Sequence, residues 1–545
     1  MTDPDASTGR LRGAATRGTA LLPALASGLA AVAGATAVGG DWPGTLVGTV
    51  AWYLLFVTPE GALAWGILTL QDAGRPLLVV GAGGLCVLLL AAVATVVVRV
   101  ARADDRGRAE ATFGTGVAQA GVVFLLILRP APALVAGLLG GVVLALSGVT
   151  VTGSRSVPGR RRLLRGVGVA LGAMGVAWTV ADRPSPVPEE PLDDPAVTAM
   201  LDAAAARSFE LPEAERLVSE RFFEVDINTS TPVVDREEWS LWIGGEGADA
   251  ALTLSYDDLI AREAEHRFVT LRCVSDEING GLMDTALWTG TSIAPLLEEA
   301  NAPEDCCVYV EAADGYYHAF PRAALENGFL AWRMNGDLLP RGHGHPVRAL
   351  IPGHWGEINV KWITRIEIRD EPATSYWEQH GWHGDGPVST VAKIHSVAAA
   401  REGTDIDDVR ESDGTRIVVG GHAYAGTRGV SGVEVSVDGG ETWTDTELSA
   451  SLPGSTPAGS DPHAAGGTGD DRDEDERDGD LAAVDGEAAD GWRMWRHEYV
   501  ASEPHEVVVR AVEADGTTQP SEETDPYPEG ASGWVSRGVD PDGLG

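Results

Sequence analysis

The sequence predicts three structural parts: an N-terminal α-helical membrane domain, a central α+β domain and a C-terminal β-sandwich. Long apolar runs occur before residue 182. Strand-like segments alternate with short helical segments between about residues 222 and 370, whereas only strands and turns follow from about residue 388. A chain of 545 residues is also too long to bury a single core, so several domains are expected.

The membrane domain, residues 1–182, is expected to contain about five transmembrane helices. Its apolar runs have spanning or near-spanning length. They cover residues 19–39, 77–99, 112–128, 131–152 and 166–181. A further apolar stretch, residues 44–70, is interrupted by Pro59, Glu60 and Gly61. This interruption predicts an interfacial or re-entrant pair of short helices rather than a sixth span.

Arginine clusters predict the orientation of these helices. With five crossings, the clusters at residues 10–17, 99–108 and 155–165 all fall on the cytoplasmic side, as the positive-inside rule requires. The N-terminus is then cytoplasmic and the soluble C-terminal part extracytoplasmic. The first histidine is His266, so the spans are not expected to bind bis-histidine haem. Because they lack internal charged pairs, an anchor or docking surface fits them better than a transporter.

Residues 159–172, G-R-R-R-L-L-R-G-V-G-V-A-L-G, admit two interpretations. They resemble a twin-arginine export signal, with paired arginines, two apolar residues and a basic residue before an apolar run. Alternatively, the arginines simply follow the positive-inside rule. Export of an already folded domain would be needed if a cofactor were inserted in the cytoplasm.

Composition sets the boundaries of the soluble part. The Pro-rich segment R-P-S-P-V-P-E-E-P opens a linker placed at residues 183–214, and a short helix-like stretch is expected at residues 195–221. The α+β domain follows at residues 215–387, and the sandwich, with D-G and G-G turns between strands, at residues 388–545. Residues 453–490 interrupt the sandwich. Because the run G-D-D-R-D-E-D-E-R-D-G-D is too charged to pack, we expect an exposed disordered insertion there.

The charge of the chain is strongly asymmetric. The net charge is −40, and residues 182–545 carry all of the excess acid. Lysine occurs only twice, at Lys361 and Lys393. A densely acidic surface poor in lysine is typical of proteins hydrated in high salt, and it argues against nucleic acid as a partner. The 16 tryptophans argue against an acidic disordered protein.

The sequence leaves the chemistry of Cys273 open. This residue ends the apolar run V-T-L-R-C and precedes the polar turn S-D-E-I-N-G-G. A core thiol, half of a disulfide, a nucleophile paired with a downstream histidine and a metal ligand are all compatible with that position. The adjacent Cys306 and Cys307 are poorly placed to bridge each other. No CxxC or CxxCH motif supports a zinc ribbon, thioredoxin chemistry or haem c.

Seven segments, in the expected order, resemble the molybdopterin-binding domain of the sulfite oxidase family. They are R-F-F-E-V-D (221–226), V-T-L-R-C-V-S-D-E-I-N-G-G (269–281), A-L-W-T-G-T-S-I-A-P-L-L (286–297), E-A-A-D-G-Y (311–316), H-G-H-P-V-R-A-L-I-P-G-H-W-G (343–356), N-V-K-W-I (359–363) and S-Y-W-E-Q (375–379). Further on, G-G-H-A-Y-A-G-T-R-G-V and V-E-V-S-V-D-G-G-E-T-W resemble the Ig-like domain that follows in that family and commonly mediates dimerisation.

The resemblance implies a cofactor and the residues that hold it. Cys273 matches the position whose thiolate binds molybdenum, which also takes the dithiolene sulfurs of one molybdopterin. The positions that match cofactor-binding residues are Phe223, Asp314, His343, Arg348, Asn359, Val360 and Lys361. Of these, Arg348 and Lys361, with His343, suit the pterin phosphate through charge-assisted hydrogen bonds. Taken without the resemblance, the two cations could be surface charges and the histidine a turn residue.

Three places depart from the pattern of true sulfite oxidases. Residues 276–278, D-E-I, occupy a turn that is arginine-rich and binds an oxyanion in those enzymes. Residues 224–226, E-V-D, stand where they have R-N-H, and their tyrosine near the metal falls at Trp382. Sulfite would meet acidic rather than basic groups, so a different substrate is expected.

The expected function is therefore that of an extracytoplasmic, membrane-anchored molybdopterin oxidoreductase. It would transfer an oxygen atom to or from a small molecule at a Cys273-ligated molybdenum. No haem or iron–sulfur ligand set is expected in this chain, so electrons would pass through a separate partner, and the Ig-like domain suggests a homodimer. The alternatives are a sulfoxide-type reductase of the same fold and a cofactor-free membrane scaffold or receptor acting through its Ig-like domain.

Overall fold

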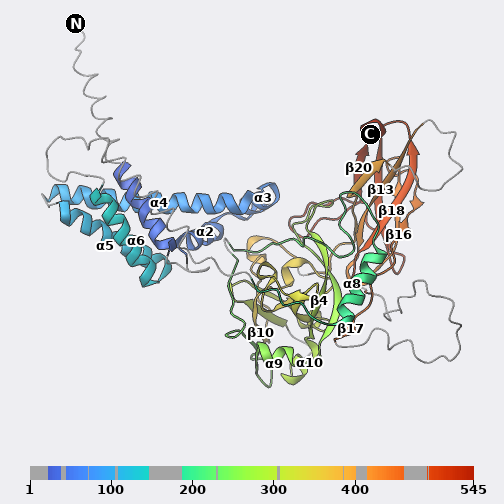
Figure 1. The fold of residues 1–545 in the computed structure, drawn as a ribbon, viewed down its shortest axis with the longest axis horizontal. Helices are drawn as coiled ribbons and strands as arrows, with labels where there is room; N and C mark the ends of the chain where they lie inside the picture. The colour runs from blue at the N-terminus through green and yellow to red at the C-terminus, as the bar shows by residue number, and fades with distance from the viewer. Residues whose placement is uncertain are drawn as a thin grey trace, which may run out of the picture. The chain divides into compact units, whose positions relative to one another are not determined.

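The chain forms two compact units, which are described separately (Figure 1). One contains the N-terminal helices, and the other consists of residues 186–226 and 234–545. The computed structural model describes residues 22–37, 45–70, 73–104, 108–146, 187–228, 231–303, 307–384, 386–399, 414–458, 488 and 490–544.

The first unit is built from apolar helices. Within the described ranges they are Leu22–Ala37, α2 (Leu46–Val57), α3 (Glu60–Leu70), α4 (Gly74–Ala103), α5 (Arg108–Ile127) and α6 (Pro130–Leu146). Two of them, α4 and α5, are long and apolar enough to cross a membrane, which agrees with the predicted spans at residues 77–99 and 112–128. The predicted spans at residues 19–39 and 131–152 are present as shorter apolar helices.

The remaining membrane predictions have different outcomes. The stretch 44–70 forms the expected pair of short helices, α2 and α3, which bend by 119° where they meet; as one broken span they would bring the number of candidates to three. The fifth predicted span, residues 166–181, and the twin-arginine-like segment, residues 159–172, lie outside the described residues. A total of five spans therefore stays a prediction.

A buried polar contact joins four helices of this unit. Gln119 of α5 donates through Nε2 to the Leu90 carbonyl of α4 (3.0 Å) and to Ser27 Oγ (3.1 Å). The Ser27 hydroxyl in turn donates to the Gly140 carbonyl of α6 (2.9 Å). Because the polar atoms bond to one another, they hold the helices together instead of standing unsatisfied among apolar side chains.

The second unit begins with a helix and two sheets that enclose a common core. The sheets have the orders β2-β1-β10-β5-β6 and β17-β3-β4-β7-β8, with β9 paired to β7 and with β17 formed by Thr456–Pro457. Their elements are α8 (Pro195–Arg207), β1 (Ser240–Gly244), β2 (Leu252–Ser255), α9 (Tyr256–Ile260), β3 (Glu265–Arg272), β4 (Met283–Ser292), α10 (Ala294–Glu299), β5 (Cys307–Ala312), β6 (Tyr317–Pro321), β7 (Phe329–Met334), β8 (Asp337–Leu338), β9 (Arg348–Leu350) and β10 (Ile363–Arg369). The core contains Ile243, Val310 and Ile366 from the first sheet and Leu330 and Ala349 from the second.

Local sequence explains why these elements form where they do. Strand β4 lies between β3 and β7 and is buried along nearly its whole length, although it includes the polar residues Asp284, Thr285, Thr289 and Thr291. Helix α9 begins with a capping box in which Ser255 and Asp258 bond to each other's backbone N–H groups. Helix α8 begins at Pro195 with an Asp194 cap and buries an alanine-rich face.

The C-terminal part of this unit consists of two antiparallel sheets around a second core. Their orders are β11-β13-β18-β16, with β12 paired to β13, and β15-β14-β19-β20. The strands are β11 (Val391–Ala392), β12 (Ser396–Ala399), β13 (Thr415–Tyr424), β14 (Val430–Ser436), β15 (Thr444–Asp445), β16 (Glu447–Leu448), β18 (Arg493–Ala501), β19 (His505–Glu513) and β20 (Val535–Val539). Val419 and Trp495 of one sheet pack with Val433 and Val509 of the other, which agrees with the predicted sandwich of two layers.

Two segments near predicted domain boundaries are ordered. Residues 195–207 of the expected linker form α8, and Asp194 at its start contacts buried His266 of β3 (Oδ2 to Nε2, 3.1 Å). At the start of the expected insertion, Thr456–Pro457 form β17 and pair with β3. Residues 459–487, which hold the charged run, lie outside the described residues.

Candidate functional site: a buried cysteine between two cationic clusters

Cys273 lies at the carboxyl end of β3, in a short turn that leads into β4. Its N–H donates to the Leu282 carbonyl (2.9 Å), and its carbonyl accepts from the Asp276 N–H (3.1 Å), so the turn is closed on both sides of the residue. Only 7% of Cys273 is exposed. The loop after β9 lies against it, because a Cβ placed on Gly356 would be 3.4 Å from the Cys273 Cα.

The surroundings of the Cys273 sulfur argue against some of the roles that the sequence leaves open. The thiol is free, and its Sγ lies 3.2 Å from the Ser275 hydroxyl. Burial raises the pKa of this thiol to about 11, which opposes the role of a free nucleophile near neutral pH. Among the described residues, no three His, Cys, Asp or Glu side chains gather into a metal site. A metal bound here would therefore take its other ligands from a cofactor.

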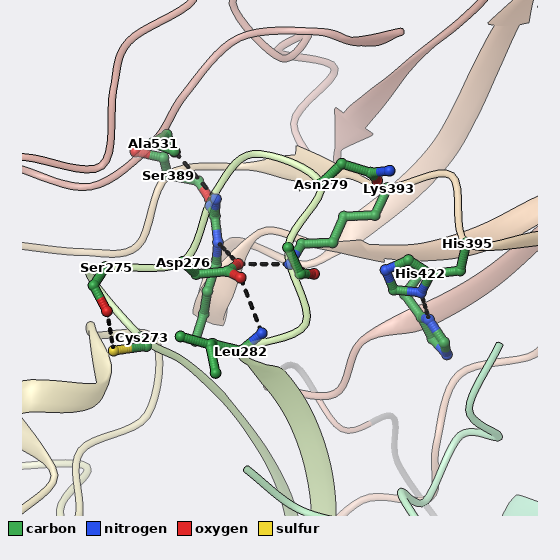
Figure 2. A network of polar contacts seen from close by, with 12 residues as sticks. Cys273, Ser275, Asp276, Asn279, Leu282, Ser389, Lys393, His395, His422 and Ala531 are labelled. Atoms are coloured by element: carbon green, nitrogen blue, oxygen red, sulfur yellow. Dashed lines mark hydrogen bonds and ion pairs between the residues drawn. The ribbon is translucent and has the colours of Figure 1, made fainter. Parts of the chain in front are cut away.

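Three buried charges, Arg272, Asp276 and Lys393, form what we call the turn network (Figure 2). Asp276 Oδ2 accepts from Arg272 Nε (3.1 Å) and from Lys393 Nζ (2.5 Å), while Oδ1 accepts from the Leu282 N–H (3.0 Å). Burial raises the pKa of Asp276, but Lys393 and Arg272 lower it more, so the net shift is downward. Burial lowers the pKa of Lys393 to about 8. The carboxylate is thus ionised and held between two cations.

The turn network corrects the sequence interpretation of residues 276–278. We expected Asp276 to face an incoming substrate, but its side chain is fully buried and bound to Arg272 and Lys393. Ile278 packs against the core of the C-terminal part. Asp276 therefore belongs to a contact between the α+β part and the C-terminal part. Its position in the sequence could not reveal this contact, because Lys393 is far away along the chain.

A histidine pair follows Lys393 along the chain (Figure 2). The Nδ1 atoms of His395 and His422 are 3.0 Å apart, and the His422 ring stacks on Trp492 with centroids 3.8 Å apart. Burial and the nearby Lys393 lower the pKa of His395 to about 4, and burial also lowers that of His422. Both rings are therefore neutral, and one donates to the other. The sequence pattern does not single out this pair.

The second cationic cluster, His343, Arg348 and Lys361, is called the loop cluster. Arg348 is 4% exposed and, within the described ranges, donates only to the carbonyls of His343 (3.2 Å) and Asn359 (3.1 Å). Lys361 Nζ donates to Asp226 Oδ2 (3.1 Å) and to the Gly342 carbonyl (2.9 Å). Burial, together with Arg348 and Lys361, lowers the pKa of His343 to about 3. The predicted positions are thus buried, and neither of the two cations is a surface charge.

The structure brings the other predicted positions close to these groups. Asn359 accepts from the Ile351 N–H (2.6 Å) and donates to the Trp355 carbonyl (2.9 Å), so it shapes the loop that reaches Cys273. Val360, which is buried, accepts from the Ala349 N–H (2.8 Å) beside Arg348.

Asp314 and Phe223 are anchored by backbone contacts. Asp314 accepts from the Tyr316 N–H (2.9 Å), and the Tyr316 hydroxyl donates to the Glu357 carbonyl (2.8 Å) of the same loop. The Phe223 N–H donates to Asp284 (2.8 Å). Phe222 beside it packs on His343, with ring centroids 5.4 Å apart. All of the predicted residues therefore belong to one connected region.

The loop cluster fits an anionic cofactor. Burying a guanidinium without a counter-ion is costly, yet Arg348 has no carboxylate partner among the described residues, and its buried Nε makes no hydrogen bond there. A phosphate group would supply both the charge and the acceptors. With a thiol at Cys273 for a soft metal, the donor set agrees with a phosphate-bearing metal cofactor.

Comparisons with known proteins agree with this chemistry. Residues 228–377 match the family described as "Oxidoreductase molybdopterin binding domain", and residues 389–526 match "Mo-co oxidoreductase dimerisation domain". Mitochondrial sulfite oxidase of Rattus norvegicus is 28% identical over 253 residues, which cover 40% of this chain and 46% of that protein. Nitrate reductase [NADPH] of Aspergillus niger is 27% identical over 281 residues, covering 43% and 32%. The predicted resemblance to the sulfite oxidase family is confirmed.

These likenesses cover only part of each protein. The chain spans about half the length of the sulfite oxidases it matches. Among solved structures, the sulfane dehydrogenase SoxCD of Paracoccus pantotrophus superposes with a TM-score of 0.44 at 18% identity, over 62% of this chain and 87% of that one.

Proposed function

Because the chain contains a molybdopterin-binding oxidoreductase domain followed by a Mo-co dimerisation domain, we propose that it is a membrane-anchored molybdenum oxidoreductase. The observation that carries the proposal is the pairing of a buried, free Cys273 thiol with a buried Arg348 that has no carboxylate partner among the described residues. The Cys273 thiol offers a ligand to a soft metal, and Arg348 offers a counter-ion to a phosphate.

Each side chain has a distinct task in this proposal. The Cys273 thiolate binds molybdenum, and Arg348 and Lys361 bind the pterin phosphate. His343, whose pKa is lowered to about 3, stays neutral and does not add a third positive charge. Asn359 and Val360 hold the loop after β9 in place, and Asp314 supports it through Tyr316. Phe223 is held by its backbone bond to Asp284 of β4. The cofactor supplies two-electron oxygen-atom chemistry, and the protein supplies binding, orientation and the surrounding charge.

The reaction proposed is oxidation of a small molecule, with water as the source of the oxygen atom and a redox carrier as the oxidant. The substrate gains one oxygen atom from water, and two protons and two electrons are released. A separate redox carrier accepts the electrons, since no haem or iron–sulfur ligand set is expected in this chain. The reverse reaction removes an oxygen atom from a sulfoxide or N-oxide, with the electrons supplied by the carrier. A relative named as a nitrate reductase supports keeping that direction as the second candidate.

The turn after Cys273 bears on the substrate in a different way from the one its sequence suggests. Asp276 does not repel an anion at the site, because it is buried and bound to two cations. The turn also offers no spare cation, since Arg272 is committed to Asp276 and to the carbonyls of Ser389 (3.0 Å) and Ala531 (3.2 Å). A sulfite dianion would lack a partner from this turn, so we favour a neutral oxygen acceptor or donor.

Location and assembly are part of the proposal. The apolar helices α4 and α5 support membrane anchoring, and the arginine distribution supports a cytoplasmic N-terminus with an extracytoplasmic catalytic part. The match to a Mo-co dimerisation domain supports a homodimer. The acidic surface supports adaptation to high salt, and an Ig-like fold of the C-terminal sandwich is expected from the resemblance.

Metal analysis tests the proposal. Full-length protein purified in detergent should contain about one molybdenum per chain, and Cys273→Ser should lose both metal and activity. Cys307→Ser is the matched control, since Cys307 lies on β5 with its Sγ on the Arg369 carbonyl. Activity should be screened on sulfite, sulfoxides and N-oxides with an artificial electron carrier. Wild-type protein without stoichiometric molybdenum would favour the alternative of a cofactor-free scaffold.

A further inference from the structure

The two lysines of this chain are both buried in ion pairs, but they come from different layers. Lys361 belongs to the loop cluster. Lys393 follows β11 in the C-terminal part and reaches across to the turn after Cys273, where it also donates to the Gly280 carbonyl (2.8 Å). Figure 2 shows Asp276 between Lys393 on one side and the Cys273–Ser275 pair on the other.

The three side chains of the turn network sum to one positive unit, and two further carboxylates act nearby, Asp284 on Lys393 and Glu357 on Cys273. Arg272 and Lys393 are cations, Asp276 is an anion, and all three side chains are fully buried. Arg272 and Asp276 flank Cys273 in the sequence, and the Asp276 N–H bonds to the Cys273 carbonyl. A charge so close to a buried group is weakly screened, because the protein interior has a low dielectric constant.

Holding the turn in place does not require these charges. Asn279 already joins the turn to the C-terminal part through two neutral hydrogen bonds, donating to the Ile394 carbonyl (3.1 Å) and accepting from the Ile394 N–H (2.9 Å). Buried ion pairs are expensive in desolvation and are often no better than apolar packing. Holding the turn against the C-terminal part therefore does not explain why these three residues are charged.

We infer that the turn network tunes the redox potential of the molybdenum held by Cys273, through its net positive charge. A nearby positive charge stabilises the more electron-rich state of the metal and so raises its potential. Lys393 supplies this charge from the C-terminal part, which makes that part a contributor to the redox centre as well as a partner-binding domain. The three residues do not contact substrate and act by positioning charge. The inference rests on the proposed function.

The test changes the net charge while keeping the shape similar. Lys393→Met lowers the charge of the network to zero. Asp276→Asn raises it to two while Lys393 stays protonated, so this variant is titrated at acidic as well as neutral pH, because Asp276 is the main group that raises the pKa of Lys393. Together, the two substitutions restore one positive unit but remove the ion pair. The potential of molybdenum is measured by redox titration of the full-length holoenzyme, followed by its paramagnetic signal, alongside metal content and thermal unfolding.

We expect the potential to follow the sign of the charge change. It should shift negative in Lys393→Met, positive in Asp276→Asn, and return close to the wild-type value in the double variant, although all three unfold at lower temperature. Asn279→Ala is the control for clamping: it should unfold earlier with an unchanged potential. Lys393→Arg keeps the charge and should also leave the potential unchanged.

Other outcomes overturn the inference. If both single variants retain molybdenum at the wild-type potential, the network is only a structural clamp. It is equally a clamp if the potential falls in every variant in proportion to lost stability, Asn279→Ala included. If Asp276→Asn cannot be purified, the potentials of Lys393→Met and Lys393→Arg are compared instead. The inference requires a negative shift in Lys393→Met and no shift in Lys393→Arg. Absence of molybdenum from the wild type is a failure of the proposed function instead, and it is seen before any variant is titrated.

Discussion

The turn network and the loop cluster are both buried and cationic, but they differ in how their charge is balanced. In the turn network, Asp276 lies between two cations and bonds to each. In the loop cluster, Lys361 has Asp226, while Arg348 bonds only to carbonyls among the residues that the structure describes. A protein that buries a charge without balancing it loses stability unless a ligand completes the site. The difference is therefore in pairing rather than in net charge: both cations of the turn network have a carboxylate partner, whereas Arg348 has none among the described residues, and it is there that we propose an anion binds.

Removing Arg348 should have the largest effect on the holoenzyme. We expect Arg348→Met to lower the molybdenum content about tenfold or more, because the pterin phosphate loses its charge-assisted hydrogen bonds. Inductively coupled plasma mass spectrometry on purified protein measures this. Arg496→Met, which removes a cation from the exposed pair with Glu447, should leave the metal content unchanged. Stoichiometric molybdenum in Arg348→Met would show that Arg348 is not needed to bind the cofactor, and the proposed difference between the two clusters would be wrong.

Removing Asp276 should have the largest effect on stability. Asp276→Asn leaves two buried cations without their anion, which typically costs about 3–5 kcal/mol. In cofactor-free protein, Arg348→Met removes an unbalanced charge and should not destabilise at all. Unfolding in denaturant, followed by tryptophan fluorescence, measures both. Equal destabilisation by the two substitutions would show that the charge of Arg348 is balanced within the chain after all.

Acid should affect the loop cluster before the turn network. The folded pKa of His343, about 3, lies below its unfolded value of about 6.5, so its contribution is complete above pH 6.5 and is lost as pH falls towards 3. At pH 5.5 the loss is about 1 kcal/mol. In cofactor-free protein, His343→Gln should therefore lose less stability than wild type between pH 7.5 and 5.5. Asp276, whose pKa is lowered below 3.8, should not respond in that range. Parallel pH profiles for wild type and His343→Gln would contradict this assignment.

Salt should produce the smallest difference between the clusters. The excess of acidic residues on the soluble part predicts that wild-type stability rises with salt, because the surface repels itself. Buried pairs are screened little. The stability difference between wild type and Asp276→Asn should thus change by less than about 0.5 kcal/mol between about 0.1 and 2 M KCl. A strong dependence would mean that water and ions reach Lys393.

The residues of the candidate site were predictable where the sequence carries an ordered motif. Cys273, Arg348 and Asn359 stand in contiguous segments with recognisable neighbours, and all three lie in the connected region. Lys393 and the His395–His422 pair were not predictable, since their partners lie 117 and 27 positions away and come together only through packing. Asp276 was misinterpreted for the same reason: its sequence neighbours are in the turn, but its charge partner comes from the C-terminal part.

The fold was predictable at the level of layers and less so at their borders. Period-two patterns and turn residues indicate strands such as β13 and β14, and apolar length indicates α4 and α5. Helix α8 has its own cap and apolar face, and it falls at the start of the helix-like stretch expected at residues 195–221. The short strand β17 depends instead on pairing with β3, so composition assigned it to a loop.

The reach of the C-terminal part into the Cys273 turn has a consequence for biosynthesis. Arg272 bonds to the carbonyls of Ser389 and Ala531, and β3 pairs with β17, so the turn acquires its final contacts only after residue 531 has left the ribosome. In a nascent chain that ends before these segments, the turn around Cys273 lacks those contacts. Loading of the metal centre should then follow synthesis of residue 531, and a product truncated before it should remain unloaded.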